Sequence, residues 1–214
     1  MRIPEEGWLD QPVSQGAENG TLRSPWGAMT LQDDRRKWNL RYREGEPPAE
    51  PPEPHPMALA WRHLWIGGPM LDAACGRGRG IASGLGAFAP IYAVDLSEEA
   101  IAQARRIWSG RHEIRWIVAD AASLAWPERR FGLVTAFGFT DMRLFRQVPR
   151  MLRPGGMFLY EGFSARQREV KPHLNAEWIG DPEALRALFA GGRILELAES
   201  DAPPFRLRMA ALAP

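Results

Sequence analysis

Three short apolar runs near the middle of the sequence constrain the fold most, because an aspartate stands at or just after the end of each. The strands are predicted over residues 69–73, 91–94 and 114–119. The acids are Asp72, Asp95 and Asp120, and segments suited to helices separate the strands. This alternation is typical of a mostly parallel sheet, in which the carboxyl ends of successive strands meet at one edge. Open α/β folds bind ligands at that edge, so the three acids are candidate site residues.

The remaining pattern completes an α/β fold. Further strands are predicted over residues 131–137, 157–160, 193–198 and 205–212. Helices are predicted over residues 33–43, 57–65, 79–88 and 141–152, after Ser97, and after Asp181. Residues 200–204 are too few to hold a helix between the last two strands, which predicts an antiparallel hairpin there. We therefore expect a Rossmann-like sheet of seven mostly parallel strands, with helices on both faces and a C-terminal antiparallel hairpin.

The chain divides into three segments. Residues 1–30 are rich in Gly, Pro, Ser and acids without hydrophobic periodicity, which predicts a poorly ordered extension. Residues 31–56 combine the first predicted helix, with Asp33 or Asp34 as its N-cap, and a stiff linker in which six prolines fall within ten residues. Residues 57–214 contain all the predicted strands and form the main domain.

Composition argues against several classes of function. The 214 residues carry a formal net charge of +1 with arginine scattered along the chain, so no nucleic-acid partner is expected. No apolar run approaches the roughly 20 residues of a membrane span, and none follows the N-terminus as in a secretory signal. Cys75 is the single cysteine, so no intramolecular disulfide can form and we expect a cytoplasmic protein. The four histidines lack metal-ligand spacing, and no metal site is predicted.

A glycine-rich turn lies between the first strand and the helix predicted to begin at residue 79. Gly76 and Gly78 in this turn would let the backbone approach a ligand closely. Nucleotide-binding proteins of several kinds share such a turn. Asp95, after the second strand, is placed to accept hydrogen bonds from both hydroxyls of a ribose. Asp120 and Ala121 follow the third strand, where an adenine edge would lie.

The order of these motifs resembles that of the class I S-adenosylmethionine-dependent methyltransferases, over about residues 57–214. The resemblance implies S-adenosyl-L-methionine as cofactor. It would place Asp72 near the methionine amino group, Gly76 and Gly78 on the pocket floor, Asp95 at the ribose with Leu96 beside it, and Asp120 and Ala121 at the adenine. Ala74, another expected cofactor contact, stands where the family often has Gly, and Phe137 ends the strand beside the reaction centre. Residues 152–156 match the family's turn before strand five.

Within that family, residues 34–42 resemble the N-terminal helix of the tellurite-resistance and thiopurine methyltransferase-like group, and residues 160–163 and 182–189 fit the same group. There, the N-terminal segment folds over the cofactor. Trp38 and Tyr42 stand four residues apart on one helical face and would be lid residues that contact the cofactor. An amphipathic helix packed on the core would show the same spacing, so both interpretations stay open.

The resemblance implies methyl transfer to a small-molecule acceptor by in-line displacement at the sulfonium methyl, in a monomer or weak homodimer. No catalytic residue is assigned, because the sulfonium already activates the methyl group and the protein mainly positions the acceptor. An oxygen or nitrogen acceptor could use Asp141, Tyr160, Glu161 or His173 as base. Two alternatives remain. One is a nicotinamide-dependent oxidoreductase built on the same turn, and the other is a non-catalytic domain that binds S-adenosylmethionine or S-adenosylhomocysteine.

Overall fold

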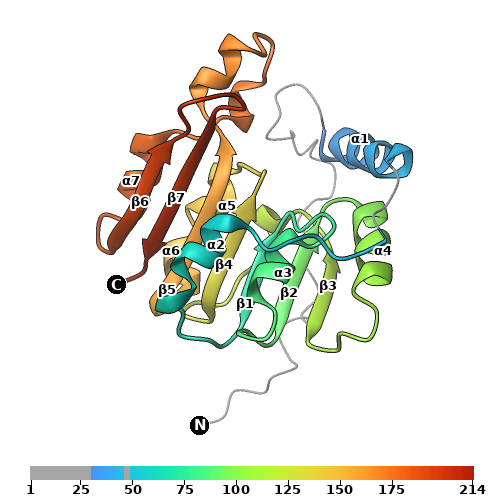
Figure 1. Cartoon of the computed structure of the whole chain (residues 1–214), viewed down its shortest axis with the longest axis horizontal. Coiled ribbons are helices and arrows are strands. Elements are labelled where there is room, and N and C mark those ends of the chain that lie inside the picture. Colours follow the sequence, from blue (N-terminus) through green and yellow to red (C-terminus); the bar gives the residue numbers. More distant parts are fainter. Residues whose placement is uncertain (1–29, 46–48) are drawn as a thin grey trace.

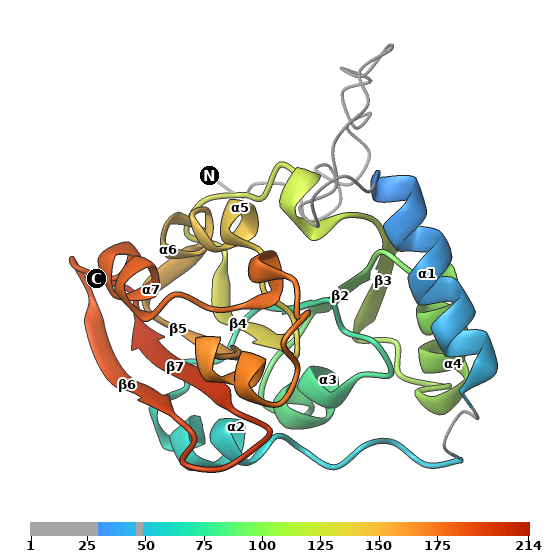
Figure 2. The ribbon, with the colours of Figure 1, turned by 90° about the horizontal axis from the view of Figure 1, so that it is seen from above.

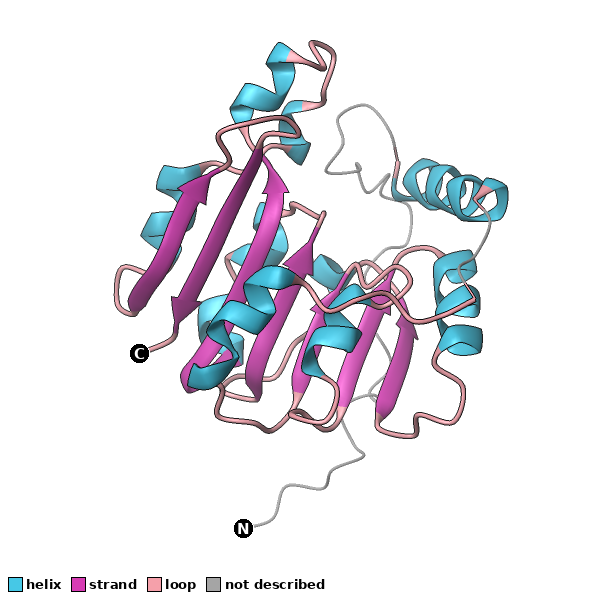
Figure 3. Cartoon of the chain, viewed as in Figure 1, coloured by secondary structure: helices cyan, strands magenta, loops and turns pink. Residues whose placement is uncertain are grey.

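Seven strands form one sheet in the computed structural model, which describes residues 30–45 and 49–214. The strands are β1 (Met70–Ala73), β2 (Ile91–Asp95), β3 (Ile114–Val118), β4 (Phe131–Phe137), β5 (Leu152–Phe163), β6 (Arg193–Glu199) and β7 (Arg206–Leu212). Their order is β3-β2-β1-β4-β5-β7-β6, and β1 to β5 run parallel (Figure 1). Strand β7 runs antiparallel to both β5 and β6 (Figure 3), which confirms the predicted fold class and its C-terminal hairpin.

Helices cover both faces of this sheet (Figure 2). The α-helices of the described residues are α1 (Leu31–Glu44), α2 (Pro56–Trp61), α3 (Arg79–Gly84), α4 (Glu98–Ile107), α5 (Met142–Phe145), α6 (Val148–Met151) and α7 (Pro182–Leu188). One cluster of buried side chains, including Phe145 and Leu185, packs α5, α6 and α7 on one face. A second cluster, including Ile81 and Ala104, packs α2, α3 and α4 on the other. Central strands β1 and β4 are therefore buried on both sides, as their mostly apolar sequences require.

Side-chain caps set where several helices begin. The predicted caps at Ser97 and Asp181 are confirmed, because each side chain accepts a backbone hydrogen bond from the first turn of its helix. The prediction that Asp33 or Asp34 caps the first helix is wrong. Thr30 is the cap: its hydroxyl accepts from the Asp33 amide at 3.2 Å, and the Asp33 carboxylate accepts from the Thr30 amide at 3.0 Å. The predicted extension before Thr30 lies outside the described residues.

Backbone constraints move several other predicted boundaries. The helix predicted over residues 141–152 divides into α5 and α6, because Pro149 has no N–H to continue the hydrogen-bond ladder of α5. Strand β5 starts at Leu152 rather than at residue 157, because Leu152 already pairs with Phe131 ahead of a bulge. The helix predicted over residues 79–88 ends at Gly84, before Gly86 takes a φ of +81°. The helix predicted over 57–65 tightens to a 3₁₀ turn after Trp61.

The Thr30 cap yields a test of how α1 is held. Thr30→Ala should cost α1 about 1 kcal/mol, because the first-turn amide of Asp33 loses its acceptor. Amide hydrogen exchange by mass spectrometry should show faster exchange in α1 and unchanged exchange in the central strands. Thr30→Ser is the matched control, since it keeps the hydroxyl, and it should exchange like the wild type. Equal exchange of α1 in both variants would contradict this assignment.

Candidate active site

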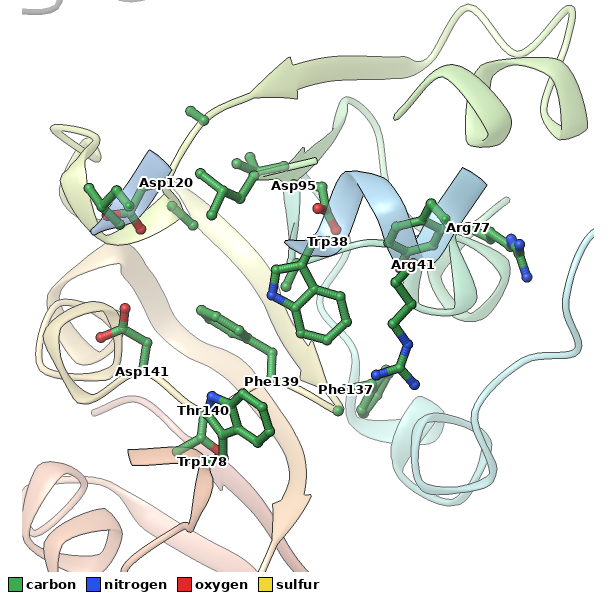
Figure 4. Close-up of a pocket in the computed structure, with 18 of the residues that line it drawn as sticks. Trp38, Arg41, Arg77, Asp95, Asp120, Phe137, Phe139, Thr140, Asp141 and Trp178 are labelled. Atoms are coloured by element: carbon green, nitrogen blue, oxygen red, sulfur yellow. The ribbon is translucent and has the colours of Figure 1, made fainter. Parts of the chain in front are cut away.

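The carboxyl edge of the parallel strands and helix α1 enclose a cavity of about 600 Å³ (Figure 4). Binding pockets for small ligands measure roughly 300–1,000 Å³, so the cavity suits a ligand of that class. The predicted site residues that line it are Trp38, Tyr42, Ala74, Asp95, Leu96, Asp120, Ala121 and Phe137. Three predicted residues, Asp72, Gly76 and Gly78, lie behind this lining rather than on it.

Asp72 supports the cavity from beneath. Its side chain is fully enclosed, with one oxygen accepting from the Ile81 amide of α3 at 3.1 Å and the other from the Thr135 hydroxyl of β4 at 2.8 Å. Burial raises the pKa of this carboxyl to about 7, against the lowering effect of the two hydrogen bonds. Asp72 therefore ties the first turn of α3 to the central strands.

The turn after β1 brings the backbone close to α1 and α4. Ala74 has a φ of +53°, in the left-handed region that favours glycine, which explains why glycine suits this position. A Cβ on Gly76 would lie 2.6 Å from the Tyr42 hydroxyl, and one on Gly78 would collide with the indole nitrogen of Trp108. Both glycines therefore permit close packing of the protein on itself, with Tyr42 between Gly76 and the cavity.

Asp95 joins this turn to the next one. One carboxylate oxygen accepts from the Gly76 amide and the other from the Ser97 amide, each at 2.8 Å. Burial raises the pKa of Asp95 above its ordinary value, while these amides oppose the shift. A carboxylate offers about four lone-pair sites, so Asp95 keeps acceptor capacity on its cavity side.

Asp120 belongs to an ionic network at the far end of the cavity. It accepts from the Ala122 amide at 3.1 Å and from the Ser123 hydroxyl at 2.7 Å. One guanidinium nitrogen of Arg143 lies 3.1 Å from Asp120 and 2.7 Å from Asp141, and so bridges the two acids. Arg143 was not predicted; it is the second residue of α5, a position that carries no distinctive sequence signal.

Helix α1 is held over the cavity by polar contacts with α4. The Asn39 side chain accepts from the Ser97 hydroxyl at 2.7 Å and donates to Glu98 at 3.1 Å. One turn further along α1, Arg43 forms an ion pair with Glu99 at 2.7 Å, so a second polar contact holds α1 on α4. Trp38 and Tyr42 then face the cavity, and Figure 4 shows Trp38 reaching from α1 toward the Phe139 ring.

His55 supports the reaction side of the cavity, a role the sequence did not suggest. Its ring stacks on Phe137 with centroids 3.9 Å apart and planes 8° apart. The Met57 amide donates to Nδ1 at 3.3 Å, so Nε2 carries the proton that is donated to Glu161 at 3.2 Å. Although burial acts to raise it, the pKa of Glu161 is lowered by the hydrogen bond from His55 and by the nearby Arg206 and Arg208.

Seven further side chains complete the cavity, and sequence reasoning missed them. They are Arg41, Arg77, Phe139, Thr140, Phe163, Trp178 and Arg206. Those beyond β4 come from the loop after β4, the end of β5, the connection from β5 to α7 and the start of β7, which converge only in the folded chain.

The four candidate bases fall into different environments. Asp141 lines the cavity, but it caps α5 and pairs with Arg143. Tyr160 is buried in the core, where its hydroxyl lies 2.9 Å from that of Thr140. Glu161 is engaged by His55, and His173 is exposed. The geometry therefore favours no general base among them.

Comparison with known proteins agrees with this architecture. Residues 70–156 match the family model described as a methyltransferase domain. A curated malonyl-[acyl-carrier protein] O-methyltransferase from Marinomonas sp. (strain MWYL1) is 29% identical over 93 residues, which cover 41% of this chain and 33% of that protein. The chain thus spans about a third of the length of the curated relative it matches.

Solved structures share the fold. A protein solved in a study of the conversion of a disulfide bond into a thioacetal group during echinomycin biosynthesis is 24% identical, with a TM-score of 0.62 over 84% of this chain and 92% of that one. The 1,6-didemethyltoxoflavin-N1-methyltransferase of Burkholderia thailandensis, solved with 1,6-didemethyltoxoflavin and S-adenosylhomocysteine, is 21% identical, with a TM-score of 0.57 over 84% and 86%.

Strand order and the family match agree over the central part of the chain. Residues 70–156 match the methyltransferase domain model, and the seven-stranded sheet that contains them has the Rossmann-like fold of the solved structures. Among the described residues, no group of three His, Cys, Asp or Glu side chains is arranged to hold a metal ion. None of the helices in residues 30–45 and 49–214 combines the length and apolar character that crossing a membrane demands.

The buried Asp72 carboxyl should make stability depend on pH. Its pKa is about 7 in the folded chain, against about 3.8 for an aspartate in an unfolded chain. Its contribution to the free energy of unfolding is therefore complete below about pH 4 and is lost as pH rises through about 7. Urea titrations of the wild type and of Asp72→Asn should give their free energies of unfolding at each pH. From about pH 4 to above pH 7, the wild type should lose up to a few kcal/mol of stability relative to Asp72→Asn.

Asp201→Asn, in the exposed loop between β6 and β7, is the control for this experiment. Its unfolding free energy should follow the wild type across the same range. A wild-type curve parallel to that of Asp72→Asn would show that Asp72 is not the titrating group.

Proposed function

We propose that the chain transfers the methyl group of S-adenosylmethionine to a small-molecule acceptor by in-line displacement at the sulfonium methyl. The observation that carries this proposal is the covered cavity itself, with Asp95 and Asp120 lining it at the ends of neighbouring strands. Acids in these positions suit the ribose hydroxyls and an adenine amino group. The ends of β4 and β5 then form the half of the cavity left for an acceptor.

The residues present fit the cofactor. Asp95 keeps acceptor sites free on its cavity side, and Ala74 and Leu96 supply a small and an apolar lining beside it. At the adenine end, Asp120 is held in place by Arg143 and by its own backbone turn. Gly76 stays outside the proposed contact set, because the Tyr42 hydroxyl stands over it.

The chain contributes positioning and exclusion of water. Bound S-adenosylmethionine supplies a methyl group already activated by its positive sulfur. Trp38 and Tyr42 cover the cavity, while the His55 ring supports Phe137 from behind. Orientation of two reactants by such walls can contribute roughly 7–11 kcal/mol to a reaction.

The proposal also covers the subgroup, the domain organisation and the form of the protein. We include membership of the tellurite-resistance and thiopurine methyltransferase-like group, which the position of α1 over the cavity supports. Residues 31–56 act with residues 57–214 as one functional unit, since α1 rests on α4. A monomer or weak homodimer in the cytoplasm is the expected form. The alternative is a non-catalytic domain that binds the cofactor. Turnover assays with a panel of acceptors distinguish the two, because only an enzyme consumes S-adenosylmethionine.

The first test concerns the cofactor. Calorimetry should show binding of S-adenosylhomocysteine and none of NAD. Asp95→Asn should weaken S-adenosylhomocysteine binding roughly 10- to 100-fold, since hydrogen bonds to a charged group contribute about 1.5–3 kcal/mol. Asp181→Asn, a cap replacement away from the cavity, is the matched control and should bind like wild type.

Because Asp95 also holds two backbone amides, a second ligand separates direct contact from damage to the turn. Asp95→Asn should weaken adenosine binding but leave that of 2′,3′-dideoxyadenosine nearly unchanged. Equal losses for both nucleosides would show that Asp95 does not hold the ribose. Binding of NAD without S-adenosylhomocysteine would overturn the proposed function.

The second test concerns α1 as a lid. Trp38→Ala should speed release of S-adenosylhomocysteine several-fold in stopped-flow fluorescence without a matching loss of melting temperature, because Trp38 faces the cavity rather than the core. Leu40→Ala is the control, since Leu40 is 55% exposed on the same helix. Equal release rates in both variants, or a fall in stability that parallels faster release, would favour a packing helix instead.

A further inference from the structure

The half of the cavity beyond β4 contains side chains to which the proposed methyl transfer assigns no role. They are Phe139, Phe163, Trp178 and Arg206. Phe163 ends β5, Arg206 begins β7, and Trp178 belongs to the connection between β5 and α7. Three flat apolar surfaces and one guanidinium thus meet where an acceptor would lie.

Arg206 is the distinctive member of this group. Its guanidinium lies 4.2 Å from the centroid of the Phe163 ring. Among the described residues, no carboxylate lies within ion-pair distance of it. The nearby acid Glu161, whose pKa the charge of Arg206 helps to lower, is engaged by His55. A partly buried guanidinium in a cavity wall is therefore left with hydrogen-bond donors to spare.

Two further cations lie beside the aromatic rings of this half of the cavity. Lys171 lies 5.9 Å from the Phe163 ring and Lys37 lies 4.1 Å from the Trp178 ring, and neither forms an ion pair within the described residues. Asp141, the acid that lines the cavity after β4, is paired with Arg143, which also contacts Asp120 after β3. An anionic ligand would meet an attractive field here.

We propose that the methyl acceptor is a planar aromatic compound with a carboxylate, which Arg206 binds while Phe139, Phe163 and Trp178 enclose its ring. A guanidinium stacked on an aromatic face keeps its in-plane N–H groups free for bidentate pairing with a carboxylate. Aromatic walls favour a flat ring over a flexible chain. This inference rests on the proposed function, since it identifies the acceptor of that same site.

The experiment uses the full chain saturated with S-adenosylhomocysteine and two probes of one shape, 2-naphthoate and its neutral amide 2-naphthamide. Calorimetry should show 2-naphthoate binding at least about tenfold more tightly than 2-naphthamide. Arg206→Met should remove that preference, and Arg206→Lys should restore part of it. Arg166→Met is the matched control, because Arg166 also stacks on a ring, that of Phe205 at 4.0 Å, but lies outside the cavity.

Equal affinity of the wild type for the two probes would overturn the inference, and so would full preference in Arg206→Met. The comparison of probes needs only the wild-type chain, so the test holds even where a variant fails to fold. Binding of S-adenosylhomocysteine, measured first in the same protein, tests the proposed function separately. A chain that binds S-adenosylhomocysteine but not 2-naphthoate contradicts the acceptor class alone.

Discussion

The carboxylate of Asp95 accepts hydrogen bonds from the Gly76 amide in the turn after β1 and from the Ser97 amide at the start of α4. Both ends of this link matter for the site. The turn forms the floor beneath Tyr42, and α4 carries the side chains that anchor α1 through Asn39 and Arg43. Burial of the acid is unfavourable, as its raised pKa shows, and the two amides offset part of that cost. The cavity thus depends on one buried carboxyl that also faces the proposed ribose position.

Charge is distributed unevenly along the cavity. Acids line the end formed by β2 and β3, where a nucleoside with hydroxyl and amino donors would lie. Aromatic rings line the end formed by β4, β5 and β7, where Arg206 lies on Phe163. Such a division suits two different ligands held side by side, because each half complements a different chemical character. His55 adds rigidity between the halves, since its ring is fixed against Phe137 by bonds at both nitrogens.

Much of the fold could be predicted because its signals are local. Strand β4 was predicted with the observed boundaries, since its seven residues form a mostly apolar run, broken by the single polar residue Thr135 and followed by a glycine. Boundaries failed where a neighbouring element decided them. Leu152 joins β5 only because Phe131 lies beside it, and Asp34 is a buried residue inside α1 rather than its cap because Thr30 takes that role. Pro149 was a local signal that the predicted single helix overlooked.

By itself, the sequence determined the class of fold and the edge at which the site lies, because strand alternation and acids after successive strands follow from residue order alone. It also placed Trp38 and Tyr42 on one helical face, and both side chains line the cavity in the structure. Tertiary structure decided what those residues meet. Only folding places Tyr42 between Gly76 and the cavity, brings His55 beneath Phe137, and joins Arg206 to Phe163. These partners come from distant segments, and their contacts depend on strand pairing and loop paths that no periodicity in the sequence encodes.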